Sequence, residues 1–142
     1  MEAQPLSELK TEFLFEVSVD LEEAQPIGST PHGIRQIFYV KGGTVEGPKV
    51  KGEVLPGGGD WFLIRPDGAG ELDVRGGILH TSPEVFQRVA RGETVDPSEY
   101  YFRTAPFYET GSEKYGWLNR VVAVAVGRMA PHWVGYSVYA IL

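Results

Sequence analysis

The chain has 142 residues, a formal net charge of −6 and no cysteine. This length suits a single domain, residues 1–142, with one buried core. The negative charge disfavours binding to nucleic acid or to an anionic membrane surface, and the lack of cysteine excludes disulfides, thiolate catalysis and zinc–thiolate sites. The first ten residues are polar and the longest apolar run, residues 121–126, is short. We therefore expect a cytoplasmic protein without a signal peptide or membrane span.

The first half of the chain alternates apolar and polar residues with a period of two, which is typical of half-buried strands. The clearest case is Thr11–Leu21, where Phe13, Phe15, Val17 and Val19 share one face. Further strands are predicted at residues 35–40, where Gly42 and Gly43 end the strand, and at 45–55, 61–65 and 71–75. The turn at residues 66–68, Pro-Asp-Gly, joins the last two strands as a hairpin.

The second half predicts one helix followed by three strands. Ser82 suits the N-cap, Pro83 suits the first helical position and Gly92 suits the stop, so we expect a helix over residues 82–91. Strands are predicted at residues 100–107, 118–128 and 133–142. Many short strands with turn signals between them indicate a mainly β protein, and a closed antiparallel barrel with one short α-helix avoids long exposed edges.

Two motifs carry a family resemblance. The first is the run KGEVLPGGGDW at residues 51–61, and the second is DPSEYYFRT at residues 96–104. With the segments at 65–68 and 107–119, they make the chain resemble the DUF3237 family of small bacterial barrel proteins over nearly its whole length. The resemblance implies a lipocalin-like barrel with an internal pocket, but no reaction. Such proteins carry a further hairpin where this chain has only residues 74–81, which puts the closure of its barrel in question.

The last long strands supply a candidate ligand site. Alternation from Trp117 places Trp117, Asn119, Ala123 and Ala125 on one face, and small side chains on an inner face leave room for one small ligand in a barrel. Trp117 then offers an apolar wall and Asn119 a polar group, with Trp61 as a further apolar candidate. The other interpretation is that the two alanines pack against a helix.

Polar candidates lie on the strand of the second motif and beside the predicted hairpin. Tyr101 and Arg103 share one strand face, and the Arg103 guanidinium can hold a ligand carboxylate. An ion pair with Glu109, Asp60 or Asp73 is the other interpretation of Arg103, and ordinary burial also explains Tyr101. Asp60 and Asp73 flank one hairpin and form a candidate acid–base pair, although Asp60 after glycine is also a typical turn residue.

The sequence contains no recognisable metal or cofactor motif. The three histidines, His32, His80 and His132, lack the spacing of metal ligands. The triple glycine at residues 57–59 lacks the lysine and the following helix of a phosphate loop. We therefore expect neither a metal nor a cofactor.

Two functions stay open at this point. In the first, the barrel binds a small apolar or aromatic organic molecule through Trp61, Tyr101, Arg103, Trp117 and Asn119. In the second, the same pocket runs a cofactor-free lyase, isomerase or cyclase reaction, with Asp73, Tyr101 and Arg103 as its acid–base groups. The valines of residues 121–126 also make the outer face of their strand apolar. Either the helix covers them or a second copy does, so we predict a homo-oligomer.

Overall fold

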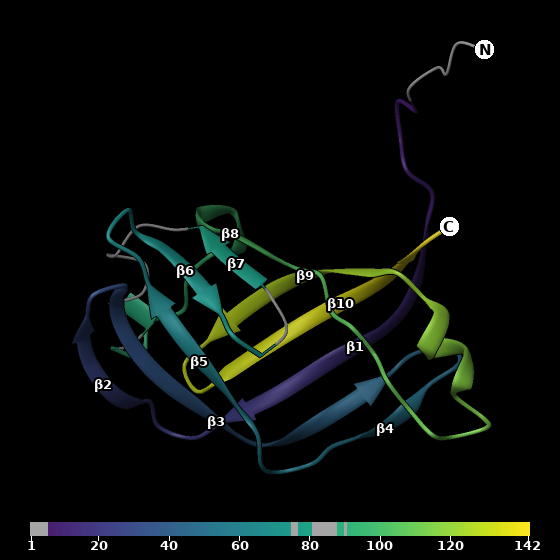
Figure 1. Cartoon of the computed structure of the whole chain (residues 1–142), viewed down its shortest axis with the longest axis horizontal. Coiled ribbons are helices and arrows are strands. Elements are labelled where there is room, and N and C mark those ends of the chain that lie inside the picture. The colour runs from purple at the N-terminus through teal and green to yellow at the C-terminus, as the bar shows by residue number, and fades with distance from the viewer. Residues whose placement is uncertain (1–5, 75–76, 81–87, 90) are drawn as a thin grey trace.

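The structure is a computed structural model that describes residues 6–74, 77–80, 88–89 and 91–142 (Figure 1). The predicted helix over residues 82–91 lies almost wholly outside the described residues. Two short 3-10 helices are described, η1 (Pro97–Glu99) and η2 (Gly116–Arg120). The strands are β1 (Thr11–Leu21), β2 (Gln25–Thr30), β3 (Gly33–Glu46), β4 (Lys51–Val54), β5 (Gly59–Ile64), β6 (Ala69–Leu72), β7 (Gly77–His80), β8 (Tyr101–Thr104), β9 (Ala123–Ala130) and β10 (Trp133–Ile141).

The strand pairings form a closed ring. From β1 the neighbours are β10, β9, β8, β7, β6, β5 and β3, and β3 pairs back to β1. Strands β2 and β4 each pair with β3 beside this ring. The pairs of the ring are antiparallel, so the predicted antiparallel barrel is confirmed. The ring closes because β7, which lies in the short 74–81 segment, pairs with β6 on one side and β8 on the other.

Strand β3 is the corner of the barrel, and it is longer than the sequence predicted. Its first half pairs with β5, whereas its second half pairs with β1 and β4. Gly42 and Gly43 were expected to end this strand, but they lie inside it at the change of partner. A Cβ on Gly43 would lie within van der Waals overlap of the Ser18 carbonyl oxygen, so glycine permits the close approach that joins β3 to β1.

The predicted hairpin at residues 66–68 is present between β5 and β6. The Arg65 N–H donates to the Ala69 carbonyl at 2.8 Å, and Gly68 adopts a φ of 86°. The Asp67 carboxylate accepts from the Ala69 N–H at 3.1 Å and pairs with the Arg65 guanidinium. The turn is therefore stabilised by its own side chains, as its sequence indicates.

Two clusters of buried side chains lie in the interior. The η2-side cluster is built around Phe15, Leu118, Ala125 and Val138. The η1-side cluster consists of Phe62, Val95, Tyr100 and Phe102. Tyr136 on β10 packs against both clusters, so it lies between them.

Strand β9 separates a buried inner face from an exposed outer face. Ala123 and Ala125 are buried, as the alternation predicted, whereas Val122, Val124 and Val126 are exposed. No occupant of this outer face is described, so the homo-oligomer stays a prediction. Among the described residues, no helix is long and apolar enough to cross a membrane.

Candidate functional site

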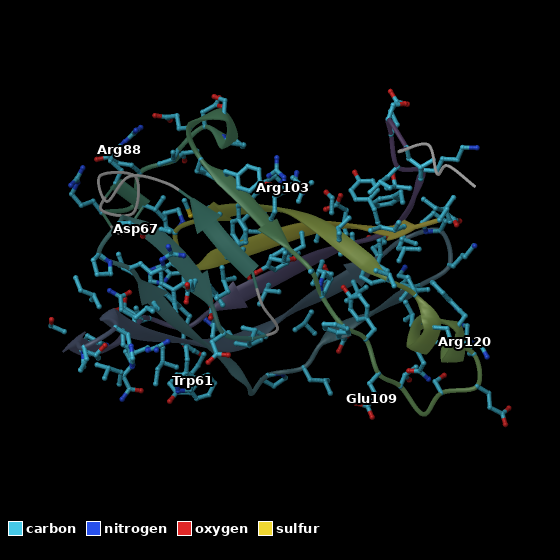
Figure 2. All side chains as sticks on the ribbon, turned by 45° about the horizontal axis from the view of Figure 1, so that its top comes forward. Trp61, Asp67, Arg88, Arg103, Glu109 and Arg120 are labelled. Carbon is cyan, nitrogen blue, oxygen red and sulfur yellow. The ribbon has the colours of Figure 1, made fainter. Side chains whose placement is uncertain are left out.

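Tyr101 and Arg103 lie on the outside of the barrel, so the prediction that they line its interior is wrong. Phe102 between them is buried in the η1-side cluster at 2% exposure, and strand alternation then turns its two neighbours outward. The Arg103 guanidinium lies 4.6 Å from the centre of the Tyr101 ring and donates to the Phe102 carbonyl at 2.9 Å. Within the described part of the chain it forms no ion pair with a carboxylate. The Arg103 side chain is labelled in Figure 2.

Trp61 also faces outward. Its ring is 44% exposed and packs edge-on against Tyr39, with 6.4 Å between ring centres. The next residue, Phe62, is the one that enters the core. Trp61 and Arg103 project from opposite sides of the molecule (Figure 2), so they do not contribute to one site.

Trp117 and Asn119 lie on η2 rather than on a strand, so the alternation that linked them to Ala123 does not hold. Trp117 is half-buried against the η2-side cluster, with the Lys49 ammonium 5.8 Å from its ring centre. Asn119 ties down the segment before η2: its Oδ1 accepts from the Thr110 N–H at 2.8 Å, and its Nδ2 donates to the Thr110 carbonyl at 2.9 Å.

Asn119 nevertheless lines a surface hollow, and Tyr108 belongs to the same hollow. The hollow lies along the segment between β8 and η2, and its walls are Phe107, Tyr108, Glu109, Thr110 and Asn119. The Tyr108 ring packs edge-on against Phe15 in the η2-side cluster, with 5.4 Å between ring centres. Tyr108 therefore lies between this hollow and the barrel interior.

Asp73 is exposed, and its backbone rather than its carboxylate contributes to the interior. The Asp73 N–H donates to Oδ1 of Asp60 at 2.9 Å. The two residues that were considered as an acid–base pair are therefore neighbours. Only Asp60, however, is carried on the inner wall.

Asp60 lies on the inner face of β5. The turn before it needs glycine, since Gly57 and Gly58 adopt φ values of 103° and 71°. Asp60 lies directly opposite Phe38 and on the same strand face as the buried Phe62, and these two aromatic rings are 5.8 Å apart. The carboxyl is thus placed beside aromatic core residues.

Burial raises the pKa of the Asp60 carboxyl to about 6. The hydrogen bond from the Asp73 N–H offsets part of this rise, the charge of Asp73 adds to it, and the Arg35 guanidinium lowers it slightly. Arg35 does not form an ion pair with Asp60, because its Nη1 donates to the Trp61 carbonyl at 2.8 Å. Asp60 is therefore a half-buried carboxyl whose proton is exchanged close to neutral pH.

Two phenols accompany Asp60. Tyr136 lies on the inner face of β10, and its ring packs edge-on against Phe102 with 5.5 Å between ring centres. Burial raises the pKa of the Tyr136 phenol, and the charges of Asp60 and Tyr108 raise it further. Burial also raises the pKa of the Tyr108 phenol to about 12. Both phenols therefore stay protonated at neutral pH and act as hydrogen-bond donors.

The sequence of β10 contains a signal for Tyr136. The inner face of β10 is formed by Val134, Tyr136, Val138 and Ala140. Among these four side chains, only Tyr136 carries a polar group, its hydroxyl. Tyr108 had no comparable signal, because it lies in an irregular segment. The proximity of Asp60 to Tyr136 arises only when the barrel closes.

Comparison with known proteins identifies the family. The model for a "Protein of unknown function (DUF3237)" matches residues 9–78 and 75–141. The chain belongs to the DUF3237 family. A UPF0311 protein of Clostridium acetobutylicum is 33% identical to it, over 99% of each chain. The resemblance inferred from the two sequence motifs is therefore confirmed.

Two solved structures of relatives have the same architecture. A conserved protein of unknown function from Rhodopseudomonas palustris superposes with a TM-score of 0.90 at 30% identity, covering 96% of this chain and 100% of that chain. A beta-barrel like protein from Acinetobacter baumannii superposes with a TM-score of 0.79 at 32% identity, covering 99% and 100%. The DUF3237 barrel is thus shared by these proteins.

Metal ligands are not gathered at this site. In the described ranges, no group of three or more His, Asp or Glu side chains is placed to hold a metal ion. The chemistry that the described residues offer is that of one carboxyl and two phenols among aromatic rings.

Proposed function

We propose that this DUF3237 protein binds a small, largely apolar or aromatic organic molecule on the inner wall of its barrel. The molecule carries a hydroxyl or amino group that donates a hydrogen bond to Asp60. The aromatic residues Phe38, Phe62 and Tyr136 provide the apolar contacts. This arrangement matches the usual composition of small-molecule sites, which combine an apolar lining with few polar groups.

The observation that carries the proposal is the setting of the Asp60 carboxyl. Oδ1 accepts one backbone hydrogen bond, whereas Oδ2 accepts none from any described residue. A half-buried carboxylate without a cationic partner lowers the stability of the fold, since desolvation of the charge is not offset. A ligand that donates a hydrogen bond to Oδ2 supplies this missing interaction and offsets the desolvation of the Asp60 carboxylate.

Tyr108 marks the route by which a ligand would enter the barrel. It is half-buried, lines the hollow beside η2 and packs against the core through Phe15. Phe107 beside it is 80% exposed, which gives the rim of the hollow an apolar surface. A ligand entering here meets aromatic side chains first and the polar pair of Tyr136 and Asp60 further inside.

A titration with 2-naphthol tests this proposal, because this neutral aromatic molecule carries one hydroxyl donor. We expect saturable binding that shifts the amide NMR signals of β5 and β10. Asp60→Ala should weaken binding by about tenfold or more, since hydrogen bonds to charged groups contribute about 1.5–3 kcal/mol. Asp67→Ala is the matched control and should leave the affinity unchanged. Shifts confined to outer residues such as Val124, or equal affinities in both variants, contradict the proposal.

A second function is favoured by one specific observation. The pKa of Asp60 lies near 6, and a carboxyl with such a value is a stronger base than an ordinary aspartate while it is still ionised at neutral pH. The alternative function is therefore a cofactor-free acid–base reaction of the lyase, isomerase or cyclase type in the same place. Asp60 replaces Asp73, Tyr101 and Arg103 as its acid–base group.

A further inference from the structure

We propose that the inner wall catalyses proton transfer at the carbon next to a carbonyl group of a bound aromatic or alicyclic ketone, with Asp60 as the base and Tyr136 as the donor to the carbonyl oxygen. The substrate class is thus a ketone that can form an enol or shift a neighbouring double bond. This inference rests on the proposed binding of an aromatic molecule at the inner wall, and it places a carbon-bound proton of the ketone at Asp60 Oδ2 instead of a hydroxyl or amino donor.

The position of Asp60 suits a general base. The hydrogen bond from the Asp73 N–H to Oδ1 holds the carboxylate in one orientation at 2.9 Å. Oδ2 accepts no hydrogen bond from the described residues, so it is available to a carbon-bound proton. The neighbouring Phe38 and Phe62 rings, packed edge-on against each other, make the surroundings of the carboxylate apolar.

Tyr136 suits the role of the donor to the oxygen. It packs against both core clusters, which fixes its ring, and it lies within electrostatic reach of Asp60. Its hydroxyl donates no hydrogen bond to a described residue. A neutral donor aimed at a carbonyl oxygen stabilises the negative charge that develops there during enolisation, and such preorganised donors commonly supply the largest part of catalysis. Tyr108 provides a second phenol on the side of the hollow.

The proposed step balances without a cofactor. Asp60 Oδ2 takes the proton from the α-carbon, and the C–H electron pair forms the carbon–carbon double bond of the enolate. The carbonyl π pair moves onto the oxygen, which accepts a hydrogen bond from the Tyr136 hydroxyl. The protonated Asp60 then returns the proton to the same carbon or, in an enone, to the γ-carbon. The enzyme is regenerated, and no oxidant, reductant or second substrate is consumed.

Charged groups around Asp60 set the pH range of this step. Asp73 lies beside it after β6, and the charge of Arg35 on β3, whose Nη1 donates to the Trp61 carbonyl, lowers its pKa. The base must be ionised, so the exchange rate should rise with pH through about 6 and reach a plateau above it. Tyr136 stays protonated across this window and does not limit the rate.

Deuterium exchange into 1-tetralone tests the inference, because the loss of its α-proton signal in D2O is measured directly by NMR. The full-length protein should accelerate this exchange by about a hundredfold or more over buffer, which is the range that general-base catalysis supplies. Asp60→Asn should reduce the rate to the buffer rate while keeping the Oδ1 acceptor. Tyr136→Phe should lower the rate by about tenfold or more.

Tyr139→Phe is the matched control. Tyr139 lies on the same strand as Tyr136 but opposite the outward-facing Val124, where its ring packs against Phe13 at 5.7 Å between ring centres. This variant should exchange 1-tetralone at the wild-type rate, and a rate as low as that of Tyr136→Phe would overturn the assignment of the inner phenol. Thermal melts of all variants check that each is folded.

Binding of 1-tetralone, measured separately by protein chemical shifts, distinguishes the two proposals. Saturable binding of 1-tetralone with exchange at the buffer rate overturns the catalytic inference, whereas the 2-naphthol titration decides the proposed binding function separately. No binding of either 1-tetralone or 2-naphthol overturns both. Accelerated exchange that persists in Asp60→Asn also overturns the inference, because the base must then be another group.

Discussion

Asp60 lies near the start of β5 and Asp67 in the turn after it, and the pKa values of their carboxyls move in opposite directions. Asp67 lies in the exposed hairpin turn, where the Ala69 N–H and the Arg65 guanidinium lower its pKa. Asp60 lies on the inner wall among aromatic rings, where burial raises its pKa. An aspartate in the exposed turn therefore stabilises the fold, whereas an aspartate on the inner wall lowers its stability.

Adjacent residues on one strand also differ between the inner and outer faces, here in burial. On β8, Phe102 is buried whereas Arg103 on the next position is exposed to solvent. On β9, Ala125 is buried whereas Val126 is 39% exposed. Burial on the inner face, rather than conspicuous side-chain chemistry, therefore distinguishes the residues of the interior from those of the outer wall.

The largest expected effect comes from breaking the inner face at β8. Phe102→Ala should lower the free energy of unfolding by about 3–5 kcal/mol, because it removes a buried ring from the η1-side cluster. Arg103→Ala on the outer face should lower it by less than about 1 kcal/mol, since its contacts are exposed. Urea denaturation of both variants measures the two values. A larger loss for Arg103→Ala than for Phe102→Ala contradicts the assignment of the faces.

The next effect sharpens the contrast between the two aspartates. The folded state holds the Asp60 proton up to about pH 6, whereas the unfolded state releases it near the ordinary value of 3.8. The free energy of unfolding of the wild type therefore falls as pH rises between these values, by up to about 3 kcal/mol. Asp60→Asn lacks this loss.

Relative to the wild type, Asp60→Asn should thus gain stability between pH 4 and pH 8. Asp67→Asn should be less stable than the wild type by a nearly constant amount over this range, because folding lowers the pKa of Asp67 and its stabilisation is lost only below about pH 4. Urea denaturation at pH 4 and pH 8 measures both changes. If the two variants shift in the same direction, the electrostatic contrast between the faces is wrong.

A smaller effect tests how closely the inner wall is packed. A Cβ on Gly127 would lie 2.4 Å from the nearest Phe102 ring atom. Gly127→Ala should therefore lower the free energy of unfolding by about 1–3 kcal/mol through overpacking. Gly111→Ala is the control, because nothing lies within 4 Å of its added Cβ. Equal thermal stability of the two variants would show that the Phe102 ring can move to make space for a Cβ at Gly127.

The smallest expected effect concerns the hollow beside η2. Asn119→Ala removes two hydrogen bonds to the Thr110 backbone, and we expect a loss of about 1 kcal/mol because both are exposed. Faster amide exchange at Thr110 should accompany this loss. Glu109→Ala in the same segment should change neither quantity. Unchanged exchange at Thr110 in Asn119→Ala would show that Asn119 does not anchor the segment.

The sequence predicted the barrel well because the strand signal is local. β1 was predicted at its observed bounds, and the 66–68 turn was predicted from residues that hydrogen-bond within it. Residues 118–128 were predicted as one strand, but they divide into η2 and β9, since an apolar run does not reveal where a 3-10 turn ends. The two glycines in β3 mark a change of partner, which depends on strands distant in sequence.

The site was less predictable because its members meet only through barrel closure. Tyr101 and Arg103 were correctly placed on one strand face, but a strand of alternating side chains does not show which face is inner. Asp60 was recognised only as a neighbour of Asp73, whereas its setting opposite Phe38 and within electrostatic reach of Tyr136 involves other strands. Which face of a short strand points into the barrel therefore depends on the strands that pair with it and pack across the interior.

The central claim is that Asp60 is a proton-exchanging carboxyl on the inner wall of the barrel. A pH titration of its side-chain carboxyl carbon by NMR, in the unmodified protein, tests this claim directly. The account predicts a midpoint near pH 6, well above that of Asp67, and a shift of the Asp60 signal when 2-naphthol is added. A midpoint near 4 for Asp60, with no response to 2-naphthol, would contradict the account.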